Sequence, residues 1–159
     1  MNKSAARHCQ RLYESLCARF GEEKAAEICG RGVSASASPE QKGQWAAEAM
    51  ERIASMLPAE ELAPVMAGCA CGPGQGQLDS ARRFWLQAGS LEEYCNKRNE
   101  EMKGSAHLEA RDGKLYISYP RCYCAMIKNS PVAIPKTWCQ CSCEFTRRSC
   151  SYAMDGRWK

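Results

Sequence analysis

Six cysteines occur in short blocks whose spacing suits metal or redox chemistry. The blocks are Cys69-Ala70-Cys71, Cys122-Tyr123-Cys124 and Cys139-Gln140-Cys141, the last of which continues to Cys143. On a β-strand, residues two apart face the same side, so each pair would present its sulfurs together. Thiolates suit zinc, and iron–sulfur clusters take the same ligands. We therefore predict a metal site with zinc as the first candidate and an iron–sulfur cluster as the second, held by Cys69, Cys71, Cys122, Cys124, Cys139 and Cys141.

The spacing leaves the composition of one ligand shell open. Zn–S bonds of about 2.3 Å in a tetrahedron place ligand sulfurs about 3.8 Å apart, closer than a flat Cys-x-Cys strand allows. Gly72-Pro73-Gly74 can supply the required kink after Cys71, whereas no glycine helps around residues 122–143. One sulfur from each of two pairs, together with the Cys69 and Cys71 loop, is an equally consistent shell. Thiols without a ligand and redox or catalytic thiols are the alternatives to a metal.

Two further residues suggest thiol activation in the segment around Cys122. Arg121 precedes Cys122, and a guanidinium beside a thiol favours the thiolate. His107, one of only 2 histidines, would complete a metal shell or act as a base for a cysteine nucleophile. The competing interpretations are a packed strand with an exposed Arg121, and ordinary surface or turn positions for His107 and His8. A thiol-dependent enzyme or redox protein acting on a small substrate is thus the alternative function.

The remaining cysteines of the first two thirds of the chain lie at helical spacing among apolar residues. These cysteines are Cys9, Cys17, Cys29 and Cys95. We predict that they pack in the protein interior, as small apolar side chains do.

Helical periodicity dominates up to about residue 104. It predicts helices over 5–20 and 22–29 with a break near Gly21, from Pro39 to the residue before Pro58 with Ser38 as the N-cap, over 78–88, and from Ser90. A short helical turn is expected between Pro58 and Gly68.

The pattern changes to strands after Gly104. Residues 107–111 and 114–119 flank Asp112-Gly113, a sequence typical of a tight hairpin turn. Further strands are predicted over 122–128 and 136–143, followed by a helix over 144–154. The fold class is therefore α+β, with N-terminal helices packed on a small C-terminal antiparallel sheet. We expect one domain over 1–159, with a helical part of about 1–104 and a cysteine-rich strand part of about 105–159.

Composition narrows the class of protein. The chain has 159 residues, of which 45% are hydrophobic and 25% charged, which argues against disordered, collagenous and coiled-coil proteins. No apolar run is long enough to span a membrane, and no signal-peptide pattern opens the chain, so a cytoplasmic location is expected. In that reducing compartment, 12 cysteines favour metal or redox chemistry over a disulfide framework.

The positive charge is concentrated near the C-terminus. Residues 1–119 carry 15 Lys and Arg against 16 Asp and Glu, net −1, whereas residues 120–159 carry 7 against 2, net +5. This excess fits a solvated basic surface, a patch for an anionic partner, or counter-charges for a thiolate site. No DNA-reading motif accompanies it, which argues against a nucleic acid as the partner. The sequence leaves the oligomeric state undetermined.

The cysteine blocks also carry a family resemblance over about residues 65–145. Cys69-Ala70-Cys71-Gly72-Pro73-Gly74, Tyr119-Pro120-Arg121-Cys122-Tyr123-Cys124 and Trp138-Cys139-Gln140-Cys141-Ser142 resemble an uncharacterised group of prokaryotic cysteine-rich proteins. That group is distantly similar to 4-vinyl-reductase and aminothiazoline-carboxylate-hydrolase-like α+β domains. The resemblance implies that the six block cysteines act as a set, and it adds a possible small-molecule ligand and a small-molecule or metal sensor as a further function. It implies no established activity.

Overall fold

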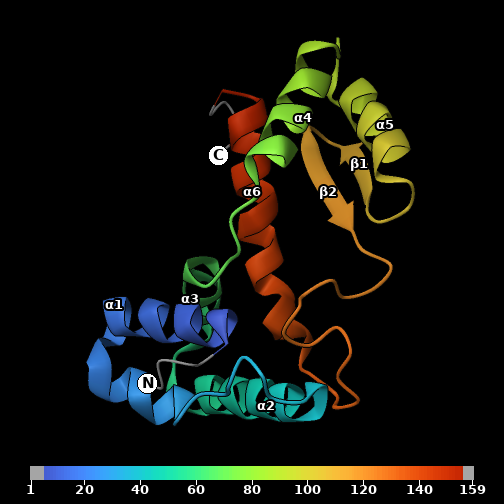
Figure 1. Cartoon of the computed structure of the whole chain (residues 1–159). Helices are drawn as coiled ribbons and strands as arrows, with labels where there is room; N and C mark the ends of the chain where they lie inside the picture. Colours follow the sequence, from blue (N-terminus) through green and yellow to red (C-terminus); the bar gives the residue numbers. More distant parts are fainter. Residues whose placement is uncertain (1–5, 156–159) are drawn as a thin grey trace. The chain divides into compact units, whose positions relative to one another are not determined.

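The computed structural model describes residues 6–155. Within them the chain forms two compact units, the first made of residues 6–71 and 123–144 and the second of residues 72–122 and 145–155. Helices dominate the N-terminal part, and one antiparallel hairpin follows them (Figure 1), which confirms the predicted α+β class. The prediction of one domain over residues 1–159 stays a prediction.

The first unit is helical. It contains α1 (Arg7–Cys29), α2 (Pro39–Met56), η1 (Ala59–Glu61), α3 (Leu62–Gly68), η2 (Lys136–Gln140) and the first turn of α6 (Cys141–Ala153). The start of α2 confirms the predicted cap, because the Ser38 hydroxyl accepts the backbone N–H of Gln41 at 3.1 Å. The Gln41 side chain in turn accepts the backbone N–H of Ser38 at 3.0 Å. This capping box satisfies two N–H groups that the first turn leaves without helical partners.

Helix α1 contains the break that the sequence predicts. At Gly21 the backbone leaves helical geometry, with φ 82° and ψ 169°, and the helix then continues to Cys29. Glycine adopts a positive φ without the steric cost that a Cβ imposes. The Arg52 side chain donates to the carbonyl oxygen of Ile28 at 3.0 Å, which satisfies one carbonyl at the end of α1.

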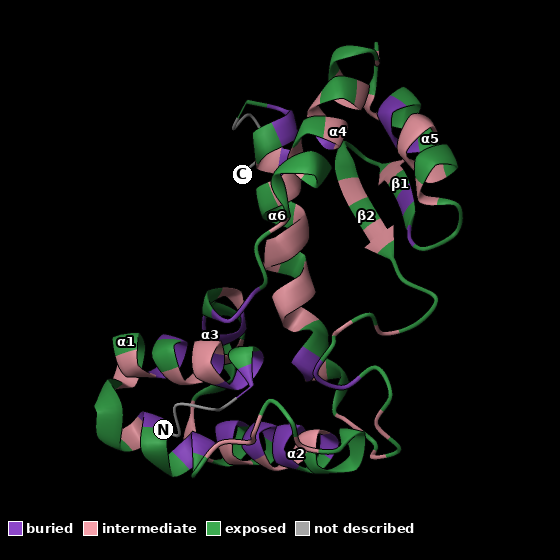
Figure 2. Cartoon of the chain, in the orientation of Figure 1, coloured by how far each residue is buried: buried purple, intermediate pink, exposed green. Residues whose placement is uncertain are grey.

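Close packing of α1 against α3 fixes the position of Cys69. The Ser15 hydroxyl donates to the Val65 carbonyl oxygen at 2.8 Å. A Cβ placed on Gly68 would lie 2.1 Å from the Ser15 hydroxyl oxygen, so only glycine permits this approach. Cys69 follows directly and is completely buried, as are several residues on the facing sides of α1, α2 and α3 (Figure 2).

The second unit combines two helices with the hairpin. Its elements are α4 (Gln75–Leu86), α5 (Leu91–Met102), β1 (His107–Arg111), β2 (Lys114–Ser118) and the part of α6 from residue 145 onward. Asp112 and Gly113 have φ angles of 51° and 69°, as a type I′ turn requires, which confirms the predicted hairpin. Leu108 pairs with Ile117 across the strands. That face packs into a core built from Ala81, Tyr94, Cys95, Leu108, Ala153 and Met154.

The predicted strands over 122–128 and 136–143 are wrong. Residues 125–129 form a turn, in which the backbone N–H of Lys128 donates to the carbonyl oxygen of Cys124 at 2.9 Å. Residues 136–140 form the 3-10 helix η2, and α6 starts at Cys141, three residues before the predicted helix. The helical period of the apolar residues that follow extends back through Cys141 and overrides the two-residue alternation of the cysteines.

The helix over 144–154 is otherwise confirmed. Cys150 and Met154 are buried as predicted, and Phe145 is half-buried. Among residues 6–155, no helix combines the length and the apolar composition needed to cross a membrane.

Candidate functional site

The first unit contains five of the six cysteines predicted as metal ligands. Cys69 is completely buried at the C-terminal end of α3, and Cys71 is exposed two residues later. Cys124 and Cys141 are half-buried, and Cys139 is exposed on η2. The sixth, Cys122, is half-buried and belongs to the second unit, where it ends the segment of residues 72–122.

Three of these cysteines lie around Cys69, and we call the group of four, Cys69, Cys71, Cys124 and Cys141, the Cys69 cluster. The thiol of Cys69 hydrogen-bonds with Cys141, and its sulfur also lies 3.2 Å from the carbonyl oxygen of Met66. Cys71 and Cys124 lie close enough for their electrostatic influence to raise the pKa of Cys69 as well. The cluster thus joins three segments that are far apart in the sequence: the end of α3 with its following loop, the turn at residue 124 and the start of α6.

The hydrogen bond between Cys69 and Cys141 shifts the pKa values of the two thiols in opposite directions. The hydrogen bond with Cys141 raises the pKa of the Cys69 thiol well above its ordinary value, and burial and the neighbouring sulfurs raise it further. For Cys141, the hydrogen bond from Cys69 lowers the pKa, and the backbone N–H groups of Cys141 and Ser142 act in the same direction against burial. These N–H groups belong to the first turn of α6, where unpaired donors favour a negative charge. Cys141 is therefore the more acidic thiol of the pair and Cys69 the less acidic one.

Helix α1 adds two side chains that the sequence prediction missed. The Nε2 atom of His8 lies 3.6 Å from the Cys69 sulfur, and Nη1 of Arg11 donates to the Cys71 sulfur at 3.0 Å. The two residues are three apart on one helix face, and together they reach both cysteines of the Cys69-x-Cys71 pair. A signal for His8 existed, because it lies four residues before buried Leu12 on the apolar face of α1.

His8 is held rigidly and in its neutral form. His8 is only 7% exposed. The centroid of its ring lies 4.8 Å from the ring centroid of Trp138. Burial and then the charge of Arg11 lower the pKa of His8 from 6.5 to about 4. Trp138 is itself buried, and its indole N–H has no hydrogen-bond acceptor among the described residues. A neutral imidazole thus faces the central sulfur of the cluster.

The two residues predicted to activate a thiol, His107 and Arg121, do not belong to the unit that contains the Cys69 cluster. His107 in β1 and Arg121 are both exposed and both belong to the second unit. The structure instead places His8 beside a cysteine sulfur.

The strand geometry expected for the sulfurs is replaced by helical geometry in the last block. Residues two apart on a helix point about 200° apart around its axis, so Cys141 and Cys143 diverge. Accordingly Cys141 is half-buried in the cluster while Cys143 is exposed. Across residues 6–155, no three His, Cys, Asp or Glu side chains lie in an arrangement that could hold a metal ion.

The cysteines predicted to pack in the interior largely do so. Cys9, Cys29 and Cys95 are buried, whereas Cys17 is half-buried and hydrogen-bonds with Tyr13. Burial raises the pKa of the Cys29 thiol to about 12, and the neighbouring Cys9 and Cys17 add to this effect. Such thiols are poor nucleophiles near neutral pH.

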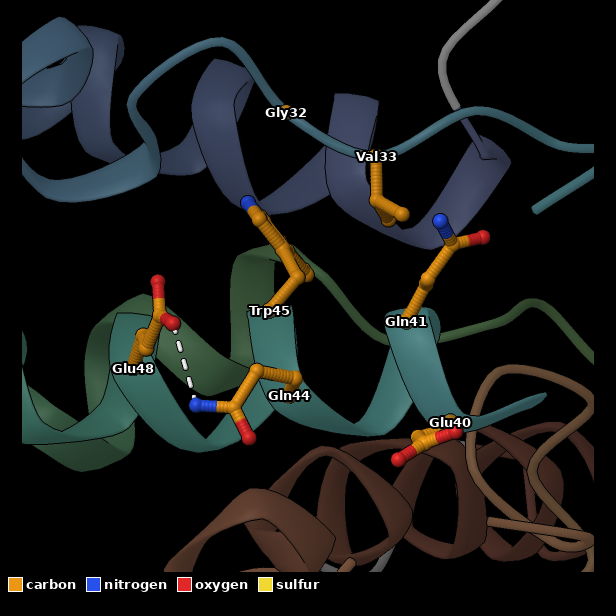
Figure 3. A pocket seen from close by; sticks show the side chains of 7 residues that line it. All are labelled: Gly32, Val33, Glu40, Gln41, Gln44, Trp45 and Glu48. Atoms are coloured by element: carbon orange, nitrogen blue, oxygen red, sulfur yellow. Dashed lines mark hydrogen bonds between the residues drawn. The ribbon is translucent and has the colours of Figure 1, made fainter. Parts of the chain in front are cut away.

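A shallow hollow of about 420 Å³ opens beside α2 in the first unit (Figure 3). Its lining includes Trp45, Glu48 and Gln44, but several of their polar groups are already bonded. The Trp45 indole N–H donates to the carbonyl oxygen of Cys29 at 2.9 Å, and Gln44 donates to Glu48 at 3.0 Å. The hollow therefore offers little for orienting a small ligand.

Fold and cluster together define a cysteine-rich α+β protein with a thiol centre in its first unit. Residues 3–157 match the model of a family of unknown function, DUF6144, and the chain belongs to this family. No curated protein and no solved structure matches the chain.

Proposed function

We propose that the protein binds a metal ion, zinc in the first place, through thiolates of the Cys69 cluster. The observation that carries the proposal is that three cysteines lie around the fully buried sulfur of Cys69, and that the four residues come from three chain segments. Packing alone does not require this, because a buried thiol is stable as a small apolar side chain. Several sulfurs brought together gain most from a cation, which favours their deprotonated forms.

The surroundings of the cluster suit such an ion. Arg11 donates to the Cys71 sulfur at 3.0 Å, and N–H donors of this kind orient metal-bound thiolates and offset their charge. Cys71 is exposed, and Cys124 and Cys141 are half-buried, so their side chains have room to turn toward a common centre. All twelve cysteines lie within the described residues. The setting that we propose is the reducing cytoplasm, where thiols serve as metal ligands more often than they form disulfides.

Metal analysis of the full chain, purified without oxygen, tests this proposal. We expect about one equivalent of zinc, and its loss in Cys69→Ser and Cys141→Ser. Cys143→Ser is the matched control, because Cys143 lies two residues from Cys141 but is exposed and points away from it. Visible absorption with iron in the sample would identify an iron–sulfur cluster instead. Well under one equivalent of either metal would reject the proposal.

Two further variants test the longer ligand list. Cys122→Ser and Cys139→Ser remove the two predicted ligands that lie outside the Cys69 cluster. We expect both to retain the metal. If either loses it while Cys124→Ser keeps it, the shell is one of the other combinations that the spacing left open.

A second function, dithiol–disulfide exchange, is favoured by the Cys69–Cys141 hydrogen bond at the start of α6. The Cys141 thiolate would attack a low-molecular-weight disulfide and release one thiol. Cys69 would then attack the mixed disulfide, release the second thiol and close a Cys69–Cys141 disulfide, so that two electrons pass to the small disulfide. Mass spectrometry of metal-free protein treated with oxidised glutathione tests this: we expect the Cys69–Cys141 link, and a trapped mixed disulfide in Cys69→Ser. Absence of both would reject it.

A role as a small-molecule or metal sensor stays the third prediction. It rests on the distant similarity to 4-vinyl-reductase-like domains inferred from the cysteine blocks, and the shallow hollow beside Trp45 adds no specific support for it.

A further inference from the structure

We infer that the β1–β2 hairpin pairs with the same hairpin of a second copy of the chain, through the outer edge of β2. The inference is independent of the proposed metal site, because the hairpin belongs to the second unit and the Cys69 cluster to the first. Its starting point is a difference between the two edges of the hairpin. One edge is occupied by a side chain of the same unit, and the other is open among residues 6–155.

The edge of β1, the strand next to α5, is closed by Asn99 of that helix (Figure 1). The Asn99 side-chain N–H donates to the Leu108 carbonyl oxygen at 2.8 Å, and the Asn99 side-chain oxygen accepts the Leu108 backbone N–H at 2.7 Å. Asn99 thus presents to β1 the donor and the acceptor that a third strand would present. These two bonds also show that the backbone polar groups of Leu108 point away from β2.

The backbone groups of Leu115 and Ile117 lie at the open edge of β2. In the register of the hairpin, Leu108 pairs with Ile117 and Ala110 with Leu115. Hydrogen-bonded and non-hydrogen-bonded pairs alternate along an antiparallel ladder, so the N–H and C=O groups of Ile117 and Leu115 also point outward. No hydrogen bond between described residues uses these groups. A regular strand with such an edge is a template for pairing with another strand.

A second copy of β2 fits this edge in an antiparallel arrangement centred on Tyr116. Leu115 of each copy then lies opposite Ile117 of the other, and the two residues exchange both backbone hydrogen bonds, which satisfies every outward N–H group. Because the side-chain faces agree in this register, the half-buried Leu115 and Ile117 continue the apolar face of the sheet across the two copies. On the opposite face the two Tyr116 side chains, each 42% exposed, form a directly facing aromatic pair.

The charges of the hairpin are compatible with this pairing. Lys114 is the only charged residue of β2, and it lies opposite Ser118 of the second copy, so no like charges meet. On β1, Arg111 pairs with Glu109 at 3.1 Å, and its guanidinium carbon lies 4.2 Å from the centroid of the Tyr116 ring. The edge therefore places apolar opposite apolar, ring opposite ring and charge opposite hydroxyl, which favours a second copy over a strand of different sequence. Two five-residue strands form a small interface, so the dimer is weak and reversible.

Sedimentation and amide hydrogen exchange of the full wild-type chain test the inference without any substitution. We expect a monomer–dimer equilibrium between about 10 µM and about 1 mM. Over that range the amides of Leu115 and Ile117 should become protected, whereas the Tyr116 amide, which bonds to β1 within the hairpin, should be protected throughout. A monomer at every concentration would overturn the inference and leave the edge to a strand from another protein.

Variants of Ser118 supply the second readout. Ser118→Glu places a carboxylate opposite Lys114 twice in each dimer and should tighten dimerisation by about 2- to 30-fold, the range expected for two cross-strand ion pairs. Ser118→Lys places like charges there and should weaken dimerisation by a similar factor. Ser105→Glu is the matched control, because it adds the same charge at an exposed position outside β2. Equal effects of Ser105→Glu and Ser118→Glu, or no effect of either, would place the interface elsewhere and overturn the inference.

Discussion

Both units bury cysteines, but the two units surround them with different neighbours. In the first unit, Cys69 lies beside Cys141, within electrostatic reach of two more sulfurs and 3.6 Å from the His8 ring. In the second, Cys95 lies in a core with Leu108, Ala153 and Met154. Burial raises the pKa of Cys150 in the second unit to about 11.

The comparison shows that burial alone does not make a thiol reactive or metal-binding; the groups that surround the buried sulfur decide this. Cys95 behaves as a small apolar side chain, because burial is the largest effect on its pKa and favours the neutral thiol. The environment of Cys69 combines burial with hydrogen bonding to a second sulfur whose pKa is lowered. A cation bound there would therefore stabilise the first unit and leave the core of the second unit unaffected.

Removing zinc gives the largest expected contrast between the units. At a free zinc concentration 1,000-fold above the dissociation constant, binding stabilises the folded state by about 4 kcal/mol. Amide hydrogen exchange with zinc and with a chelator should show that loss of protection in α1 and α3, with α5 and the β1–β2 hairpin unchanged. Equal loss in both units would contradict a metal centre confined to the first.

A serine in place of Cys95 tests the packing role in the second unit. A hydroxyl buried in that apolar core should cost about 1–3 kcal/mol of unfolding free energy, because it loses its hydrogen bonds to water. Denaturant unfolding measures the loss, and metal content should not change. Cys143→Ser, at an exposed position, should shift stability by less than about 0.5 kcal/mol. Reduced zinc content in Cys95→Ser would show that the two kinds of cysteine are not distinct.

Local signals in the sequence were enough for the elements that carry their own start and stop residues. The Ser38 cap, the Gly21 break and the Asp112-Gly113 turn all formed as predicted, because each depends on a few adjacent residues. The segment from 122 to 143 failed because the alternating cysteines imitate a strand while Pro135 and the apolar residues after Cys141 impose a helical period. There the longer pattern prevailed.

The cluster was predictable only in part. Cysteine spacing pointed to Cys69, Cys71, Cys124 and Cys141, but their association depends on tertiary packing of α3 and α6 residues that no local pattern encodes. For His8 the sequence suggested only an ordinary surface or turn position, because helical periodicity identifies an apolar face but not what that face meets. The close approach of Ser15 in α1 to Gly68 in α3, one residue before Cys69, depends on both helices together.

Alkaline pH gives the smallest and most local contrast, between Cys29 of the first unit and Cys150 of the second. Burial raises the folded-state pKa of these thiols from 9.0 to about 12 and about 11 respectively. Above pH 9 the unfolded state releases the proton and the folded state keeps it, so stability is complete below pH 9 and falls as the pH rises.

The fall should be about 1.4 kcal/mol per pH unit for each thiol, ending near pH 11 for Cys150 and near pH 12 for Cys29. Denaturant unfolding at a series of pH values between 8.5 and 10.5 measures it, with Cys29→Ala and Cys150→Ala each expected to be less sensitive to pH than the wild type. Their absolute stability at pH 8.5 will also be lower because of the lost packing, so the slope carries the test. If Cys29→Ala keeps the wild-type slope, Cys29 is ionised in the folded first unit, and burial does not isolate it from the chemistry of its neighbours.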